Sequence, residues 1–202
     1  MASIFREHNS YCIHIDPYSD LKFRETVDNI LKCYQQTYPQ TYIHKANDNI
    51  PVFWGHFSIV EAELNCLRDL YYNGHQWRYA LDLAGSEIMM KTNRELVRFL
   101  KKTDGAIHTK AVNMMTYSEE LNKRIKYKYH FPNVDKRIEE KGEAKFLRYV
   151  NRTLADPIPF NIEVYKGRKC WQIPRAFVKF VLEHPVALKF IGMIKIKTSL
   201  KC

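Results

Sequence analysis

The sequence lacks the apolar segments that would place it in or across a membrane. No apolar run approaches the roughly 20 residues that a membrane-spanning helix needs. The first ten residues, MASIFREHNS, lack the apolar core of a signal peptide. Taken by itself, the chain is therefore expected to be soluble and to carry no targeting signal.

The chain also has few cysteines, and their spacing is not that of a zinc site. The five are Cys12, Cys33, Cys66, Cys170 and Cys202, and none forms a Cys-x-x-Cys pair. Structural zinc is therefore not expected. The thiols could all be free, as in a cytosolic protein, or one or two disulfides could form in a lumenal one. The odd count leaves at least one thiol unpaired.

Acidic residues are scarce in the second half of the chain relative to basic ones. Residues 1–90 hold 7 Lys+Arg and 11 Asp+Glu, and residues 91–202 hold 25 and 11, giving net charges of −4 and +14 that make up the total of +10. A basic half can meet nucleic acid, an acidic membrane surface or a phosphorylated small molecule. With 46% hydrophobic residues, the chain is long enough for one domain with a core.

What the sequence does contain is a helix–strand–loop–helix pattern in residues 53–101. Ser58 and Glu61 form a Ser-x-x-Glu pair, which predicts a capping box and a helix start. That helix is expected to stop at Asn73-Gly74, because both residue types tolerate positive φ. Residues 77–83 (WRYALDL) indicate a buried strand. A second pair, Thr92 and Glu95, predicts a second capping box.

The polar loop over residues 85–92 is the first candidate site. Helix, strand, loop and helix in this order are half of an open α/β sheet. Ligands in such sheets bind where the strands end, beside the first turn of the next helix.

Asp16 and Trp54 are further candidates. Asp16 ends the predicted strand YCIHID (residues 11–16), and an acidic residue at a strand end often contacts the ribose or base of a nucleotide. The alternative is a turn or helix-cap aspartate. The next predicted elements are a helix over residues 20–34 and a second strand over residues 38–45. Trp54 could stack on a flat ring, a contact worth about 1–3 kcal/mol, or it could be an ordinary core residue.

Four blocks of residues resemble the core-2/I-branching β-1,6-N-acetylglucosaminyltransferase family in their order and spacing. They are YCIHID (11–16), SIVEAELNCLRDLY (58–71), WRYALDLAGSEIMMKTNRELVRFLK (77–101), and the stretch from YKG through WQIPRAFV (165–178). The resemblance covers about residues 10–190, with a divergent middle at about 103–150. Each block alone would be a weak signal, whereas the ordered set is fairly specific.

The resemblance implies an α/β, GT-A-like nucleotide-sugar transferase fold that is partial, with the first strand and the C-terminal catalytic part missing. Residues 1–191 would form the partial glycosyltransferase domain, and residues 192–202 a divergent basic tail. Family members transfer N-acetylglucosamine from UDP-N-acetylglucosamine to an O-glycan on a glycoprotein, with inversion and without a metal. They lie on the lumenal side of the Golgi membrane, held by an N-terminal anchor that this chain does not contain.

The resemblance also implies roles for individual residues. Asp16 and Trp54 fall on positions that contact the donor nucleotide, and Cys12 and Cys66 on positions that form a disulfide. Asp16, Trp54 and the loop over residues 85–87 are therefore expected to converge on one edge of a mostly parallel sheet. Lys123 and Arg124 lie in residues 118–131, a segment that matches the family's acceptor-binding region only loosely. The alternative is that both residues belong to a solvated helix face. Asn151 begins an Asn-Arg-Thr glycosylation sequon. There is no Asp-x-Asp metal motif. The family neutralises the diphosphate with Lys and Arg instead, and those residues lie beyond this sequence.

The sequence departs from the family in two places that bear on catalysis. The family's usual Gly-x-Asp-aromatic-Pro loop is Gly85-Ser86-Glu87-Ile88-Met89 here, which keeps the charge but loses the rigid proline. The family's catalytic base is a Glu in a Ser-Pro-Asp-Glu motif some thirty residues after the position of Gly167. Residues 190–202, which cover that place, contain no acidic residue, so no catalytic residue is assigned and the chain as given is expected to be inactive.

Three alternatives stay open from the sequence. A peptide O-xylosyltransferase-like specificity is the nearest enzymatic one, and a noncatalytic module that keeps part of the sugar-nucleotide site is another. The third is a basic nucleic-acid-binding protein that uses KRIKYKYHF (123–131) as its surface. Because the chain has no recognised nucleic-acid motif, a nucleic-acid partner is not expected.

Overall fold

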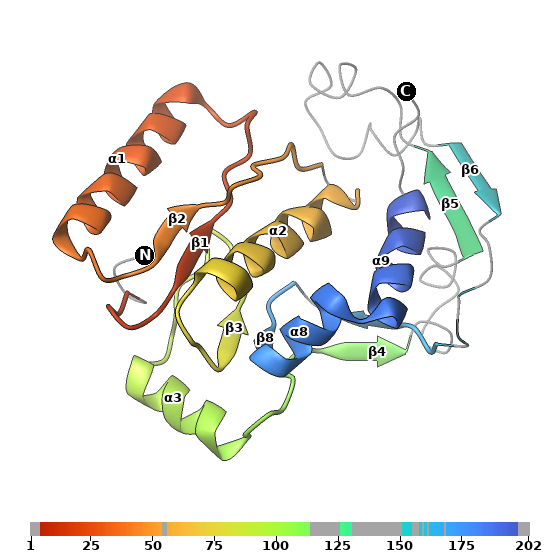
Figure 1. Cartoon of the computed structure of the whole chain (residues 1–202). Coiled ribbons are helices and arrows are strands. Elements are labelled where there is room, and N and C mark those ends of the chain that lie inside the picture. Colours follow the sequence, from red (N-terminus) through yellow and green to blue (C-terminus); the bar gives the residue numbers. More distant parts are fainter. Residues whose placement is uncertain are drawn as a thin grey trace.

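The protein is a mixed α/β molecule whose described strands are short and lie among helices (Figure 1). The structure is a computed structural model. It describes residues 5–53, 56–113, 126–130, 151–154, 158, 160, 162–167 and 169–197. The elements, with the labels of Figure 1, are β1 (Tyr11–Ile13), α1 (Leu21–Thr37), β2 (Ile43–Lys45), α2 (Ser58–Asn73), β3 (Tyr79–Leu81), α3 (Asn93–Lys102), β4 (Ala111–Asn113), β5 (Tyr127–His130), β6 (Asn151–Leu154), β7 (Tyr165–Gly167), β8 (Gln172–Pro174), α8 (Arg175–Glu183) and α9 (Pro185–Lys197).

The strands form pairs rather than one open sheet within the described residues. β1 and β2 are parallel, as expected for two strands joined by the crossover helix α1. The other pairs, β3–β8, β4–β7 and β5–β6, are antiparallel. The expectation of a mostly parallel sheet is therefore wrong for the described part. The strand that pairs with β3 comes from about 90 residues later in the chain, and local periodicity carries no signal for such a partner.

A disulfide between Cys12 and Cys66 fastens β1 to α2, with the two Cα atoms 5.5 Å apart. This is the pairing that the family resemblance implied. It closes a separation of 54 residues and joins a strand to the helix packed on it. Among the other cysteines within the described residues, Cys33 and Cys170 are free and exposed.

Helix α2 begins and ends for reasons other than those the sequence suggested. Its N-cap is Phe57, without a side-chain cap, so the predicted capping box at Ser58 and Glu61 is wrong. The Ser58 hydroxyl is buried and accepts a hydrogen bond from the Phe53 N–H at 3.0 Å. The helix ends at Gly74, whose φ is −78°, so a positive φ is not what selects glycine there. A Cβ on Gly74 would lie 2.5 Å from the carbonyl oxygen of Leu70, and that close approach excludes a side chain.

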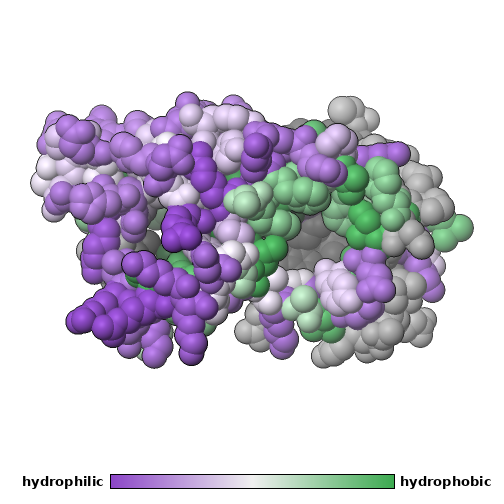
Figure 2. All heavy atoms as spheres, turned by 60° about the horizontal axis from the view of Figure 1, so that its bottom comes forward, coloured by the Kyte–Doolittle hydropathy of each residue, from purple (hydrophilic) through white to green (hydrophobic). Residues whose placement is uncertain are grey.

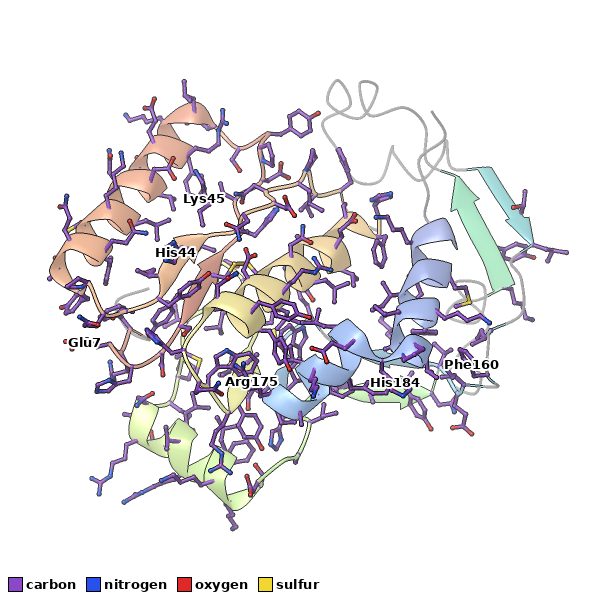
Figure 3. The ribbon with its side chains drawn as sticks, in the orientation of Figure 1. Glu7, His44, Lys45, Phe160, Arg175 and His184 are labelled. Carbon is purple, nitrogen blue, oxygen red and sulfur yellow. A yellow bond between two sulfur atoms is a disulfide. The ribbon has the colours of Figure 1, made fainter. Side chains whose placement is uncertain are left out.

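The main core cluster lies between α2, the β3–β8 pair and α8. Its buried members are Leu67, Ala80, Ile173 and Val178. Arg175, at the start of α8, closes one side of this cluster (Figure 3). Its guanidinium lies 4.6 Å from the ring centroid of Tyr71 and 4.8 Å from that of Trp77, and it donates a hydrogen bond to the Tyr71 carbonyl. The first residue of α8 is thus also a packing point between α8 and α2.

Helix α3 is the most polar of the described helices. Its predicted capping box is present: the Thr92 hydroxyl accepts from the Glu95 N–H, and the Glu95 carboxylate accepts from the Thr92 N–H at 2.9 Å. None of its residues is buried. Figure 2 shows hydrophilic side chains over the half of the molecule that carries α1 and α3, and a hydrophobic patch over the half that carries α8.

Helix α9 runs without interruption from Pro185 to Lys197 and packs on α8 and β5. It therefore crosses residue 192, where the sequence suggested that a divergent tail begins. The boundary itself stays a prediction, but residues 192–197 are helical and continuous with the residues before them. Among the described helices, none combines the length and the apolar character needed to cross a bilayer.

Candidate functional site

Asp16 lies just beyond β1 and joins the end of that strand to the segment that precedes α2. One carboxylate oxygen accepts a hydrogen bond from the Tyr18 N–H at 2.9 Å, and the other accepts from the Val52 N–H at 3.1 Å. A further link runs in parallel, from the Ile15 N–H to the Asn49 side-chain oxygen at 2.9 Å. Asp16 therefore holds a turn and a chain crossing at the carboxyl end of the β1–β2 pair.

The Asp16 carboxylate can accept further hydrogen bonds besides the two that hold the turn and the chain crossing. An ionised carboxylate offers about four lone-pair directions, and the two backbone N–H groups take two of them. The turn alternative and the nucleotide-binding role are thus physically compatible. Trp54, the other expected nucleotide contact, lies outside the described residues, two positions after Val52. Its role stays a prediction.

The loop after β3 is fixed by Glu87. The Glu87 carboxylate accepts hydrogen bonds from the Ala84 N–H and from the Cys170 thiol, each at 2.7 Å. The thiol bond and the backbone bond together lower the pKa of Glu87. The same contact raises the pKa of the Cys170 thiol, which disfavours a nucleophilic thiolate. The loop is therefore tied to the segment before β8. No contact within the described residues joins it to Asp16, so the expected convergence of the two stays a prediction.

Two acidic residues, Glu63 and Asp82, are each hydrogen-bonded to Trp171. The Glu63 carboxylate accepts a hydrogen bond from the Trp171 indole N–H at 3.3 Å, and the Asp82 backbone N–H donates to the Trp171 carbonyl at 3.0 Å. Burial, with the charge of Asp82, raises the pKa of Glu63 to about 7 against the opposing effects of Trp171 and Lys169. Burial also raises the pKa of Asp82. A carboxyl that titrates near neutrality is unusual, and sequence reasoning missed it.

The remaining predicted residues are placed as follows. Lys123 and Arg124, the expected acceptor-binding residues, lie outside the described residues. Asn151 begins β6, where its backbone pairs with His130. Glycosylation of Asn151 stays a prediction. Within the described residues, no group of three or more His, Cys, Asp or Glu side chains is arranged to hold a metal ion.

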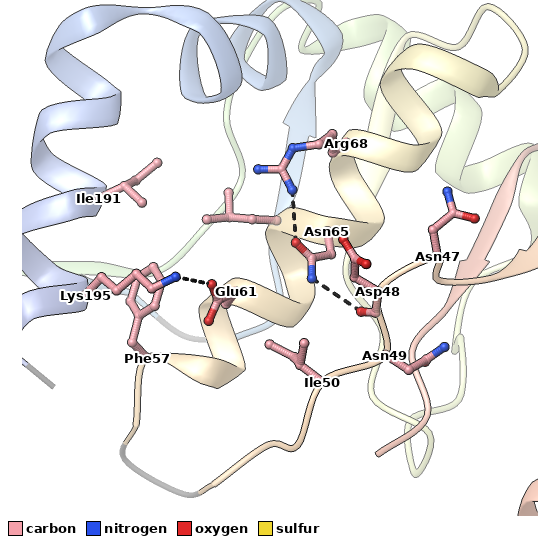
Figure 4. A pocket seen from close by; sticks show the side chains of 11 residues that line it. Asn47, Asp48, Asn49, Ile50, Phe57, Glu61, Asn65, Arg68, Ile191 and Lys195 are labelled. Carbon is pink, nitrogen blue, oxygen red and sulfur yellow. Dashed lines mark hydrogen bonds and ion pairs between the residues drawn. The ribbon is translucent and has the colours of Figure 1, made fainter. Parts of the chain in front are cut away.

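A cavity of about 580 Å³ opens between residues 47–50, residues 57–68 at and after the start of α2, and helix α9 (Figure 4). Its floor includes Asn65, which is buried and whose amide is fixed at both ends. The amide N–H donates to the Asp48 carbonyl at 3.3 Å, and the amide oxygen accepts from the Arg68 guanidinium at 2.9 Å. Across the opening, Lys195 of α9 forms an ion pair with Glu61 of α2.

Sequence reasoning missed this cavity, although one signal was present. Glu61, Asn65 and Arg68 recur at i, i+4 and i+7, which places three polar side chains on one stripe of a helix whose other face is apolar. The contribution of α9 could not be read from the sequence, because Lys195 is 134 residues away from Glu61.

Comparison with known protein families gives a match over nearly the whole chain. The family model described as "Branch: Core-2/I-Branching enzyme" covers residues 1–191. The chain belongs to the core-2/I-branching enzyme family.

Individual members of the core-2/I-branching family align with 96% of this chain. A Bos taurus protein named beta-1,3-galactosyl-O-glycosyl-glycoprotein beta-1,6-N-acetylglucosaminyltransferase 3 is 30% identical over 195 residues, or 39% of its own length. A Bovine herpesvirus 4 protein with the corresponding name is 28% identical over 39% of its length. A Mus musculus N-acetyllactosaminide beta-1,6-N-acetylglucosaminyl-transferase is 30% identical over 44% of its length.

The chain thus spans about two fifths of the length of the curated relatives it matches. The core-2/I-branching match includes Asp16, the 84–87 loop and every residue that lines the cavity except Lys195. Apart from Lys195, the candidate site therefore lies within the part of the chain that matches the family.

Proposed function

We propose that the protein is a glycosyltransferase that moves N-acetylglucosamine from UDP-N-acetylglucosamine to an O-glycan on a glycoprotein, with inversion and without a metal. The observation that carries this proposal is the family match over residues 1–191. The relatives named above are all β-1,6-N-acetylglucosaminyltransferases, which supports the same donor sugar. The finer fold assignment, a GT-A-like arrangement, and a lumenal Golgi location belong to the same proposal.

Asp16 and Trp54 are proposed to hold the uridine nucleotide. The support for Asp16 is its place at the end of β1 and its fixed orientation, because the Val52 N–H and the Tyr18 N–H restrict how the carboxylate can turn. A side chain locked by backbone hydrogen bonds can recognise a nucleotide without losing further conformational freedom on binding. Trp54 would add stacking on the base, a contact of about 1–3 kcal/mol.

Lys123 and Arg124 are proposed to contact the acceptor. The disulfide between Cys12 and Cys66 fastens β1, at whose end Asp16 lies, to α2. Chemically, transfer also needs a base that takes the proton of the acceptor hydroxyl. Residues 190–202 hold no acidic side chain, so these 202 residues by themselves are proposed to bind the donor without transferring it.

The test is a binding panel with the purified chain. Isothermal titration calorimetry would compare UDP-N-acetylglucosamine, UDP-xylose, GDP-mannose and a single-stranded oligonucleotide. We expect saturable binding of the two UDP sugars, with N-acetylglucosamine preferred. Preference for UDP-xylose would favour the peptide O-xylosyltransferase-like alternative. Binding of the oligonucleotide alone, weakened steeply by salt, would overturn the proposal in favour of a nucleic-acid-binding protein.

A further inference from the structure

The cavity between α2 and α9, called here the α2–α9 pocket, has the size of a small-molecule site. Its volume of about 580 Å³ lies within the roughly 300–1,000 Å³ typical of such sites. It is lined by Asn47, Asp48, Asn49, Ile50, Phe57, Glu61, Leu64, Asn65, Arg68, Ile191 and Lys195. Figure 4 shows that these side chains come from three separate parts of the chain and surround one space.

The charges around the α2–α9 pocket cancel. Asp48 and Glu61 supply two negative charges, and Arg68 and Lys195 supply two positive ones. The Lys195 ammonium is taken up by Glu61, and one N–H of Arg68 by Asn65. A nucleotide diphosphate needs uncompensated positive charge, which this arrangement does not offer. The balance favours a ligand that is polar and uncharged.

The hydrogen-bonding groups that remain suit hydroxyl groups. The Asp48 carboxylate has no hydrogen-bond partner within the described residues, and Arg68 keeps N–H donors beyond the one that Asn65 accepts. A sugar hydroxyl both donates and accepts, so it can bridge a carboxylate and a guanidinium that face the same space. The buried amide of Asn65 fixes the position of Arg68, so the donor side is ordered before any ligand binds.

The remaining wall of the α2–α9 pocket is apolar. Phe57 and Leu64 are buried on the α2 side, Ile50 precedes them on the loop, and Ile191 faces them from α9. A pyranose ring has a hydroxyl-bearing rim and a C–H face, and such a ring matches a site with one polar and one apolar wall. A small inorganic ion would leave this apolar wall without a partner.

We propose that the α2–α9 pocket binds an uncharged saccharide unit of the acceptor glycan. This inference rests on the proposed function, since a branching transferase must hold a glycan chain as well as its donor. It adds a subsite made by Asp48, Arg68 and Asn65 to the residues assigned above. It also separates the two substrates by charge: the nucleotide at Asp16 and the neutral glycan at α2–α9.

The test uses the intact chain and two neutral probes, galactosyl-β-1,3-N-acetylgalactosamine and N-acetyllactosamine, followed by NMR titration. Asp48→Ala and Arg68→Ala should each weaken saccharide binding about fivefold, the effect of losing one or two hydrogen bonds. Arg98→Ala is the matched control, because Arg98 is an exposed cation on α3 that does not line the pocket. UDP binding is measured in parallel on every variant, and circular dichroism verifies that each variant is folded.

The outcomes separate this inference from the proposed function. Weaker saccharide binding in both pocket variants, with UDP binding and Arg98→Ala unchanged, supports the saccharide subsite. Saccharide binding that neither pocket variant alters, or none at all in a chain that binds UDP, overturns the subsite and leaves the proposed function standing. Loss of UDP binding in the pocket variants also overturns it, because the pocket would then serve the donor. A folded chain that binds neither probe nor UDP overturns both proposals.

Discussion

Glu63 and Asp82 are two partly buried carboxyl groups close enough for the charge of Asp82 to affect Glu63. Their ionisation is therefore coupled to folding. The folded protein raises the pKa of Glu63 from its ordinary value of 4.5 to about 7, chiefly through burial and secondarily through the charge of Asp82. Of the other charged groups here, Lys169 opposes both shifts and Glu87 adds to that of Asp82. A raised carboxyl pKa means that the folded state binds the proton more tightly than the unfolded state.

The first prediction follows from that sign. Glu63 favours folding fully below about pH 4.5, and this contribution is lost as the pH rises through about 7. Between about pH 5 and about pH 8 the free energy of unfolding should fall by on the order of 2 kcal/mol from this group, a value reduced for its partial exposure to solvent. Glu63→Gln should flatten the fall. Urea unfolding at a series of pH values, followed by tryptophan fluorescence, measures it.

Glu25→Gln is the control for this prediction, because Glu25 lies exposed on α1, away from Trp171. It should leave the pH profile of the wild-type protein unchanged. A profile for Glu63→Gln that matches the wild type would show that Glu63 is not the group responsible.

The second residue-scale prediction concerns glycine. In Gly74→Ala the new Cβ would meet the Leu70 carbonyl oxygen at 2.5 Å, and the end of α2 must shift to relieve the contact. We expect a loss of about 1–3 kcal/mol in the free energy of unfolding, as for other overpacked sites. Gly85→Ala is the matched control, since no atom lies within 4 Å of the position that its new methyl group would take. Equal urea midpoints for the two variants would contradict the role of close approach at Gly74.

At the scale of the elements, the disulfide is what fastens β1 to α2. It closes a separation of 54 residues, for which the loss of chain entropy in the unfolded state corresponds to about 4 kcal/mol. The double variant Cys12→Ser/Cys66→Ser should lose stability of this order in thermal unfolding. Cys33→Ser, which removes an exposed free thiol on α1, should change little. A double variant as stable as the wild type would mean that packing alone holds β1 on α2.

Local elements of this fold could be predicted from the sequence where one short segment contains its own partners. The capping box of Thr92 and Glu95 is such a case, because both side chains serve backbone groups within the same turn. The pair at Ser58 and Glu61 has the same spacing, yet Ser58 bonds to Phe53 and Glu61 to Lys195. Ser58 is engaged by a residue just before the helix, and Glu61 by one 134 residues away, for which a local window has no signal.

The candidate site shows the same division. The sequence made Asp16 a candidate, because it ends a strand pattern and falls on a family position, and its role stays a prediction. It could not indicate the α2–α9 pocket or the raised pKa of Glu63. The pocket brings together Glu61 and Lys195, which are 134 residues apart. The raised pKa comes chiefly from the burial of Glu63, which lies beside Trp171, 108 residues away. The polar stripe of Glu61, Asn65 and Arg68 on α2 is the part of the pocket that the sequence could show, whereas the packing of α9 against it depends on distant segments.

At the scale of the whole molecule, the chain is predicted to bind the donor nucleotide sugar without transferring its N-acetylglucosamine. The 202 residues should give no detectable transfer of labelled N-acetylglucosamine to a core-1 disaccharide, because residues 190–202 supply no carboxylate where the family has its base. A general base contributes typically about 10²–10⁴-fold to the rate. A full-length relative assayed alongside is the positive control. Product formed at a rate near that of the relative would mean that another carboxyl serves as the base.

The measurement that tests the central claim most directly is a UDP titration of the chain by calorimetry, with Asp16→Asn and Asp20→Asn alongside. Both variants lose one negative charge, and Asn keeps an acceptor for the N-cap of α1 in the second. The account predicts saturable UDP binding that weakens at least about tenfold in Asp16→Asn and is unchanged in Asp20→Asn. A folded wild-type chain with no saturable binding, or equal affinity in all three proteins, would contradict it.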